Sequence, residues 1–217
     1  MQPWRIGWMH RPLSLPGHIS LTVALLVFFA GSGLTIARAE TLPLDPKGST
    51  LTFFGESFLH NFHGEAKEFT GSAELDPSAT PPVQKATLHF KTAALTTFNN
   101  SRDQKMRDWL QINAHPDATF ALESVKLTEG DIQKADANHP AKFAVSGTLT
   151  LNGVKQPIGG AATGWREKDR LIVSGETVID TLKHALPQIR EAFMTVATNV
   201  KTTYRFSFVL PPGYAVK

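Results

Sequence analysis

The chain has no cysteine among its 217 residues. Disulfide bonds, thiolate zinc sites, iron–sulfur clusters and covalently attached c-type haem are therefore excluded. A single domain of this length can still be stable without cross-links, because it buries a large hydrophobic core.

Long apolar runs are also scarce, which bears on membrane attachment. The most apolar stretch, Ile19–Ala30, is shorter than the roughly 20 residues that a membrane-spanning helix needs. It follows two arginines and precedes Ala37-Arg38-Ala39, an A-x-A cleavage pattern. This arrangement predicts a cleaved signal peptide over residues 1–39. Residues 40–217 are then one domain in the periplasm, with no stable membrane anchor.

The chain carries an excess of positive charge, but this excess belongs to the N-terminal segment. The net charge is +3, with 22 Lys and Arg against 19 Asp and Glu. Three of the arginines and none of the acidic residues lie in residues 1–39, so the predicted mature domain holds 19 residues of each sign. A neutral domain offers no electrostatic footprint for a nucleic acid, and we expect no such partner.

Regular alternation of apolar and polar residues dominates the rest of the chain. It is strongest over residues 143–151 and 200–210, and each run is typical of a half-buried antiparallel strand. Asn152-Gly153 follows the first run directly. This dipeptide favours a tight hairpin because both central positions of a type I′ turn need a positive φ. Weaker strands are predicted at 49–55, 69–75, 83–93, 118–127, 158–164 and 171–179.

Helical signals are few. Ser101 can cap a short helix that ends near Leu110, and a second helical turn is predicted over 182–190, where Pro187 keeps it short. Many short strands separated by turns predict an all-β domain, either a closed barrel or a sandwich.

Two stretches, 99–120 and 145–157, carry an ordered set of residues. The set consists of Arg102, Asp103, Met106, Arg107, Pro116, Thr119, Phe120, Gly147, Leu149, Thr150, Gly153, Val154 and Pro157. It resembles the pattern of the YceI family of bacterial periplasmic proteins. The resemblance implies an antiparallel, lipocalin-like β-barrel of about eight strands with one or two short helices. It also implies that the barrel carries a long isoprenoid lipid.

A barrel of about eight strands is just wide enough for packed side chains or for one small ligand. Alternation alone favours a filled core, whereas the resemblance implies an apolar cavity around a hydrocarbon tail. The residues then expected at the ligand are Phe53, Leu88, Phe90, Arg102, Asp103, Met106, Trp109, Phe120, Phe143, Leu149 and Phe206.

Arg102 and Asp103 are the charged members of this set, and we expect them at the rim of the barrel. The planar guanidinium group of Arg102 suits a quinone carbonyl or a phosphate head group. The alternative is a surface pair between Asp103 and Arg107, which are spaced i,i+4 on the predicted helix. For Arg102 both interpretations stay open.

His60 and His63 are further candidates for contact with the head group. An alternative hypothesis makes them metal ligands, with a third histidine, in a periplasmic metal-binding protein or metal-dependent enzyme. Residues three apart on a strand point to opposite faces, which disfavours a shared ion, so neither a metal site nor a cofactor is expected. The chain contains no G-x-S-x-G, P-loop or G-x-G-x-x-G motif, and no catalytic residue is predicted.

The sequence therefore predicts an exported lipid-binding protein that is not an enzyme. Its expected partner is an isoprenoid lipid or isoprenoid quinone, held in the barrel by burial and without chemistry. The alternatives are the metal protein described above and a periplasmic interaction module with a solid core. A homodimer is kept as a further alternative.

The signal peptide provides the first test. We expect the protein isolated from the periplasm of its host to have an intact mass that corresponds to a chain beginning at Glu40. Ala39→Asp should block cleavage, because the A-x-A site requires small residues. Arg38→Ser changes only the middle residue and should be processed normally. A periplasmic chain that keeps residues 1–39, or begins elsewhere, would contradict the prediction.

Overall fold

The computed structural model describes residues 39–57, 60–191 and 194–214. The predicted signal peptide lies outside the described residues except for Ala39, so its cleavage stays a prediction. Within the described ranges no helix is both long and apolar enough to cross a membrane.

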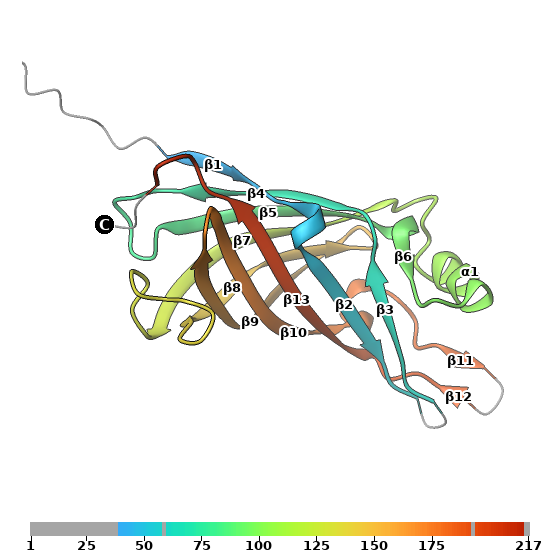
Figure 1. Cartoon of the computed structure of the whole chain (residues 1–217). Coiled ribbons are helices and arrows are strands. Elements are labelled where there is room, and N and C mark those ends of the chain that lie inside the picture. The colour runs from blue at the N-terminus through green and yellow to red at the C-terminus, as the bar shows by residue number, and fades with distance from the viewer. Residues whose placement is uncertain (1–38, 58–59, 192–193, 215–217) are drawn as a thin grey trace, which may run out of the picture. The chain divides into compact units, whose positions relative to one another are not determined.

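The described part forms an antiparallel sheet of eleven strands and a separate two-stranded hairpin (Figure 1). The strands of the sheet are β1 (Glu40–Pro43), β2 (Thr50–Gly55), β3 (Phe62–Ala66), β4 (Phe69–Leu75), β5 (Val83–Lys91), β6 (Leu95–Thr96), β7 (Asp117–Glu129), β8 (Ala141–Leu151), β9 (Val154–Glu167), β10 (Arg170–Asp180) and β13 (Asn199–Val209). Their order is β1-β4-β5-β7-β8-β9-β10-β13-β2-β3-β6. The hairpin consists of β11 (Arg190–Glu191) and β12 (Met194–Thr195).

Bent strands close the sheet into a barrel. Only Lys67 and Glu68 separate β3 from β4, and β5 continues into β6 through the 3-10 turn η2 (Thr92–Ala94). Strands β4 and β5 pair with each other and with β1 and β7. Strands β3 and β6 pair with each other at the other end of the strand order, where β3 also pairs with β2. Beyond β1, Leu44 bridges Phe208 of β13. If β1–β2, β3–β4 and β5–β6 are each counted as one bent strand, eight strands surround the interior, in agreement with the prediction.

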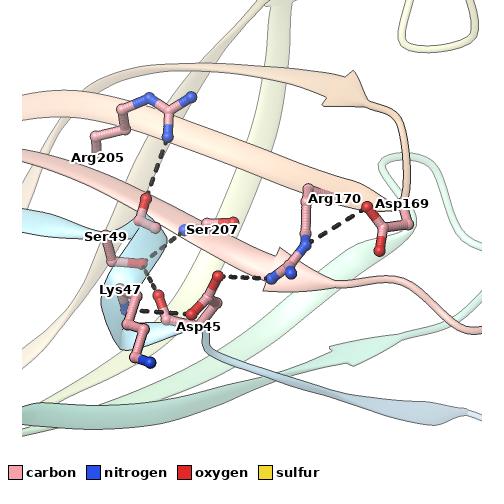
Figure 2. A network of polar contacts seen from close by, with 8 residues as sticks. Asp45, Lys47, Ser49, Asp169, Arg170, Arg205 and Ser207 are labelled. Carbon is pink, nitrogen blue, oxygen red and sulfur yellow. Dashed lines mark hydrogen bonds and ion pairs between the residues drawn. The ribbon is translucent and has the colours of Figure 1, made fainter.

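A polar cluster on the outer surface ties the first bent strand to its neighbours (Figure 2). The 3-10 turn η1 (Pro46–Gly48) lies between β1 and β2, and Asp45 at its start accepts a hydrogen bond from Arg170 Nη1 of β10 at 2.7 Å. The backbone N–H of Asp45 donates to the Ser207 carbonyl at 2.7 Å, and the Ser207 N–H donates to Ser49 Oγ at 2.9 Å. These bonds hold β13 to the bent strand at the point where η1 interrupts the ladder.

The structure confirms the all-β class and the predicted hairpin. Asn152 and Gly153 have φ values of 51° and 73°, as a type I′ turn requires. The one α-helix of the described part, α1 (Asn100–Trp109), is capped by Asn99 and not by Ser101, because the Asn99 side chain accepts the Arg102 N–H at 3.0 Å. The second predicted helical turn is shorter than expected: it is the 3-10 turn η3 (Thr181–His184).

The buried core lies on one side of the barrel, between β1, β4, β5 and β13. Leu42 and Leu75 are almost fully buried there, and the Phe69 ring packs between Phe90 and Phe206 with centroids 6.0 Å from each. The alternating residues of β13 supply Phe206 and Phe208 to this core, as their period of two predicts.

Several aromatic rings of the wall lie over glycines of neighbouring strands. A Cβ atom on Gly64 of β3 would lie 2.2 Å from the Phe53 ring of β2, and one on Gly147 of β8 would lie 2.8 Å from the Phe120 ring of β7. The Tyr204 hydroxyl would meet a Cβ on Gly175 at 2.5 Å. Each ring therefore occupies the side-chain space of a glycine and extends along the wall.

This packing makes the cross-strand glycines sensitive to substitution. Gly64→Ala should lower the free energy of unfolding by about 1–3 kcal/mol, because the new methyl group must displace the Phe53 ring and also meets the Thr96 carbonyl at 2.6 Å. Gly164→Ala is the matched control, since its nearest contact is a ring atom of Phe143 at 3.1 Å and its nearest backbone atom is 3.6 Å away. Chemical denaturation of both variants measures the difference. Equal losses would show that ring placement over Gly64 does not matter.

Candidate functional site

An apolar cavity of about 340 Å³ lies inside the barrel. Its wall draws side chains from α1 and from β2, β4, β5, β6, β7, β8, β9, β10 and β13, and these are overwhelmingly aliphatic and aromatic. The volume falls within the range of small-molecule binding sites, about 300–1,000 Å³. The interior is therefore open, and the filled core that alternation alone favours is wrong.

Most of the sequence-predicted ligand residues belong to this wall. They are Phe53, Leu88, Phe90, Met106, Phe120, Phe143, Leu149 and Phe206. Seven of them lie on strands, where alternation with outward polar residues turns them inward. Met106 comes from α1 and shows that the helix packs against one part of the cavity. Whether these residues contact a ligand stays a prediction.

Trp109 was also expected to face the cavity, but it does not belong to the wall. Its indole N–H donates to the Pro187 carbonyl at 2.7 Å, which joins α1 to the segment after η3. The next residue, Leu110, is buried and lines the cavity in its place. The helical period places these two neighbours on different sides, and the sequence pattern did not distinguish which one turns inward.

Arg102 and Asp103 are likewise absent from the cavity wall. Arg102 Nε donates to Thr97 Oγ1 and Arg102 Nη2 donates to the Thr97 carbonyl, both at 2.8 Å. The same guanidinium group lies 4.6 Å from the centre of the Phe62 ring. Arg102 therefore joins α1 to the segment after β6, and a contact with a lipid head group stays a prediction without support from its position.

The contacts of Arg102 and Asp103 with Thr96 and Thr97 form a helix anchor for α1. Asp103 is its buried centre, with only 3% of its surface exposed. Its carboxylate accepts hydrogen bonds from Thr96 Oγ1 at 2.7 Å, from the Thr97 N–H at 2.7 Å and from Thr97 Oγ1 at 2.5 Å. Burial by itself would raise the pKa of Asp103. The bonds from the two threonines, helped by the charge of Arg107, outweigh burial and hold this pKa below its usual value.

His60 and His63 lie outside the cavity wall and are exposed. His63 is on β3, and its ring centre lies 5.4 Å from that of Phe98. A third histidine, His184, is buried with its Nδ1 3.1 Å from the Val154 carbonyl. Within the described ranges no three His, Cys, Asp or Glu side chains come together in a metal-binding arrangement. No observation therefore supports the metal hypothesis.

Several polar residues of the wall were not predicted as site residues, among them Arg166 and Thr202. Arg166 is the one charged residue of the described wall, in register with Leu171 and Phe208. It is exposed, and its Nε donates to the Lys168 carbonyl at 2.9 Å in the turn between β9 and β10. Extending the predicted strand 158–164 by its period of two would have found it. Thr202 is buried and belongs to the alternating inward face of β13. It was seen in that pattern, but a threonine carries no recognisable binding motif.

Glycine backbone forms part of the cavity wall between β9 and β10. Ala162 and Gly175 are the last pair of the ladder between these strands, although both strands continue beyond it. Past this pair, Thr177 Oγ1 donates to the Gly159 carbonyl at 3.0 Å. Gly159 and Gly160 are exposed and also line the cavity, so glycine backbone separates the interior from solvent there.

The sequence model of the YceI-like domain matches residues 43–208, which includes most of the barrel. The chain belongs to the YceI family. A UPF0312 protein of Pseudomonas putida is 36% identical over 135 residues, which covers 58% of this chain and 63% of that protein. The alignment thus spans less than two thirds of this relative. The protein YceI of Escherichia coli O6:H1 is 31% identical over 148 residues, covering 64% of this chain and 68% of the relative.

Solved structures show that this YceI-family chain shares its fold with more distant proteins. Burkholderia cenocepacia BcnA superposes with a TM-score of 0.62 at 18% identity, covering 76% of this chain and 98% of BcnA. A polyisoprenoid-binding domain from Saccharophagus degradans superposes with a TM-score of 0.60 at 18% identity, covering 78% of this chain and 98% of that domain. The lipocalin-like barrel expected from the resemblance is therefore confirmed.

The helix anchor yields a pH-dependent prediction. Asp103→Asn should lower the free energy of unfolding at pH 7 by about 1–3 kcal/mol, because an amide cannot accept all the bonds of the buried carboxylate. The pKa of Asp103 is lower in the folded state than the roughly 3.9 of an unfolded chain. Its contribution is thus complete above pH 4 and is lost as the pH falls through the folded pKa.

Thermal unfolding at several pH values measures this effect, with the exposed α1 residue changed in Asp108→Asn as control. The gap between the two variants should be largest at neutral pH and should shrink below about pH 4. A gap that stays constant down to acid pH would contradict a role for the ionised Asp103.

Proposed function

We propose that this protein binds a long isoprenoid lipid, either a polyisoprenoid or an isoprenoid quinone, inside the barrel and without chemistry. The open apolar cavity is the observation that carries the proposal. Each CH₂ group moved from water into such a cavity contributes about 0.8 kcal/mol, so a hydrocarbon tail that follows the wall gains affinity with each carbon. The alternative of a solid-cored interaction module does not fit the open interior.

Two further facts support this class of ligand. The chain belongs to the YceI family, and a protein of the same fold is a polyisoprenoid-binding domain. The described wall has one charged side chain, Arg166, so a tail inside the barrel meets almost no polar surface. A small polar substrate would leave its hydrogen-bonding groups unpaired against this wall, which disfavours it.

The proposal includes export to the periplasm. Strand β1 begins at Glu40, directly after the predicted cleavage site, and Glu40 pairs with Leu75 of β4. Removal of residues 1–39 would therefore leave every strand of the barrel intact. A periplasmic carrier of this kind would shield an isoprenoid tail from water.

Occupying the cavity with a side chain tests the proposal. Val145 of β8 lines the cavity, and its neighbour Ala144 is exposed on the outer face. Val145→Trp should reduce the amount of co-purified isoprenoid, and the affinity for an added one, by at least about tenfold, because a few lost CH₂ contacts at about 0.8 kcal/mol each suffice. Ala144→Trp should bind like the wild type.

Native mass spectrometry and lipid extraction of protein from its own host measure the bound lipid, and circular dichroism verifies that both variants fold. Wild-type protein that carries no lipid and takes up none of an added isoprenoid series would contradict the proposal. The same holds if Val145→Trp folds and still binds with unchanged affinity.

A further inference from the structure

Thr202 of β13 belongs to the wall of the apolar cavity and carries a buried hydroxyl group without a hydrogen-bond partner in the protein. The residue is 5% exposed. Buried polar groups are almost always paired, so an unpaired one needs a specific explanation. By register Thr202 lies between Phe53 of β2 and Thr177 of β10, which face the same interior.

The other threonines of the wall make this one distinctive. Thr92 Oγ1 donates to the Pro116 carbonyl at 2.8 Å, Thr177 Oγ1 to the Gly159 carbonyl at 3.0 Å, and Thr181 Oγ1 to the Thr198 carbonyl at 3.0 Å. These three hydroxyl groups are satisfied by backbone carbonyls. Thr202 is the one described threonine of the wall whose buried hydroxyl group makes no hydrogen bond within the protein.

The charge around Thr202 restricts what that group can be. Arg166 is the one charged side chain of the described wall, and it lies in register with Leu171 and Phe208. Thr202 is six residues before Phe208 on the same strand, a separation of about 20 Å at roughly 3.3 Å per residue. An anion bound at Thr202 would therefore lack any countercharge, and burying an unpaired charge is strongly unfavourable.

The geometry points to Thr202 as the contact for an uncharged oxygen of the lipid head group, an alcohol or a quinone carbonyl, buried at the end of the barrel where β10 leads into η3. This inference rests on the proposed lipid-binding function and adds head-group selectivity to it. The tail then extends along β13 toward Phe208 and Arg166. A hydroxyl can donate to a carbonyl and can also accept from an alcohol, so Thr202 serves both head groups.

Three probes with one carbon skeleton test the inference: geranylgeraniol, geranylgeranyl diphosphate and the corresponding hydrocarbon without oxygen. Competition measured by native mass spectrometry should show that wild-type protein prefers the alcohol to both others. The preference over the hydrocarbon should be about two- to tenfold, the effect of one net hydrogen bond. Thr202→Val should remove this preference and leave the affinity for the hydrocarbon unchanged.

Thr203→Val is the matched control, because Thr203 is the next residue of β13 and belongs to the opposite, outer face. It should keep the preference for the alcohol. Thr202→Val should also fold at least as stably as the wild type in thermal unfolding, because an unpaired buried hydroxyl is replaced by a methyl group of the same shape.

The outcomes separate the inference from the function on which it rests. If none of the three probes binds, the lipid-binding proposal itself fails. If all bind but the alcohol has no advantage, or Thr202→Val keeps that advantage, only the role of Thr202 is overturned. Tighter binding of the diphosphate would also overturn it and would direct attention to Arg166 at the other end of the cavity.

Discussion

Aromatic rings that rest on glycines of neighbouring strands keep the interior of this barrel open. Eight strands surround a space that side chains can fill completely. Phe53, Phe120 and Tyr204 instead extend over Gly64, Gly147 and Gly175, where any other residue would push them away from the wall. The rings thus provide apolar surface without occupying the centre. The cavity depends on this arrangement, and so do the proposed ligand class and head-group contact, because a filled barrel would have none of them.

The charged residues Arg102 and Asp103 of the family pattern hold the helix in place and do not line the cavity. Arg102 and Asp103 bind Thr96 and Thr97 and so attach the start of α1 to the wall. This attachment also positions part of the cavity wall, since Met106 of α1 and Leu110 directly after the helix line the cavity. The pair therefore acts on the cavity through the position of α1, and a buried carboxylate that accepts several hydrogen bonds is well suited to fix that position.

The cavity itself is asymmetric along its length. Thr202 lies toward one end and Arg166 toward the other, with apolar side chains such as Phe206 between them. Two unlike polar groups about 20 Å apart on an apolar wall would make the two ends different for the proposed lipid, because a neutral hydroxyl lies at one end and an exposed cation at the other. The glycine-lined border between β9 and β10 lies beyond the last ladder pair, Ala162–Gly175, and leaves glycine backbone between the cavity and solvent there.

The sequence alone determined the strands, the hairpin at Asn152-Gly153 and the inward faces that hold Phe90, Phe120 and Phe206, because a period of two specifies side-chain direction locally. Only the tertiary structure decided whether these faces enclose a space. That outcome depends on which glycine lies across from which ring, and on bends such as the one between β3 and β4, and both are set by pairing between distant segments. The same reason explains why Trp109 and Arg102 were assigned to the ligand while Thr202 and Arg166 were missed. A hydroxyl left without a partner becomes visible only once every neighbouring strand is in place.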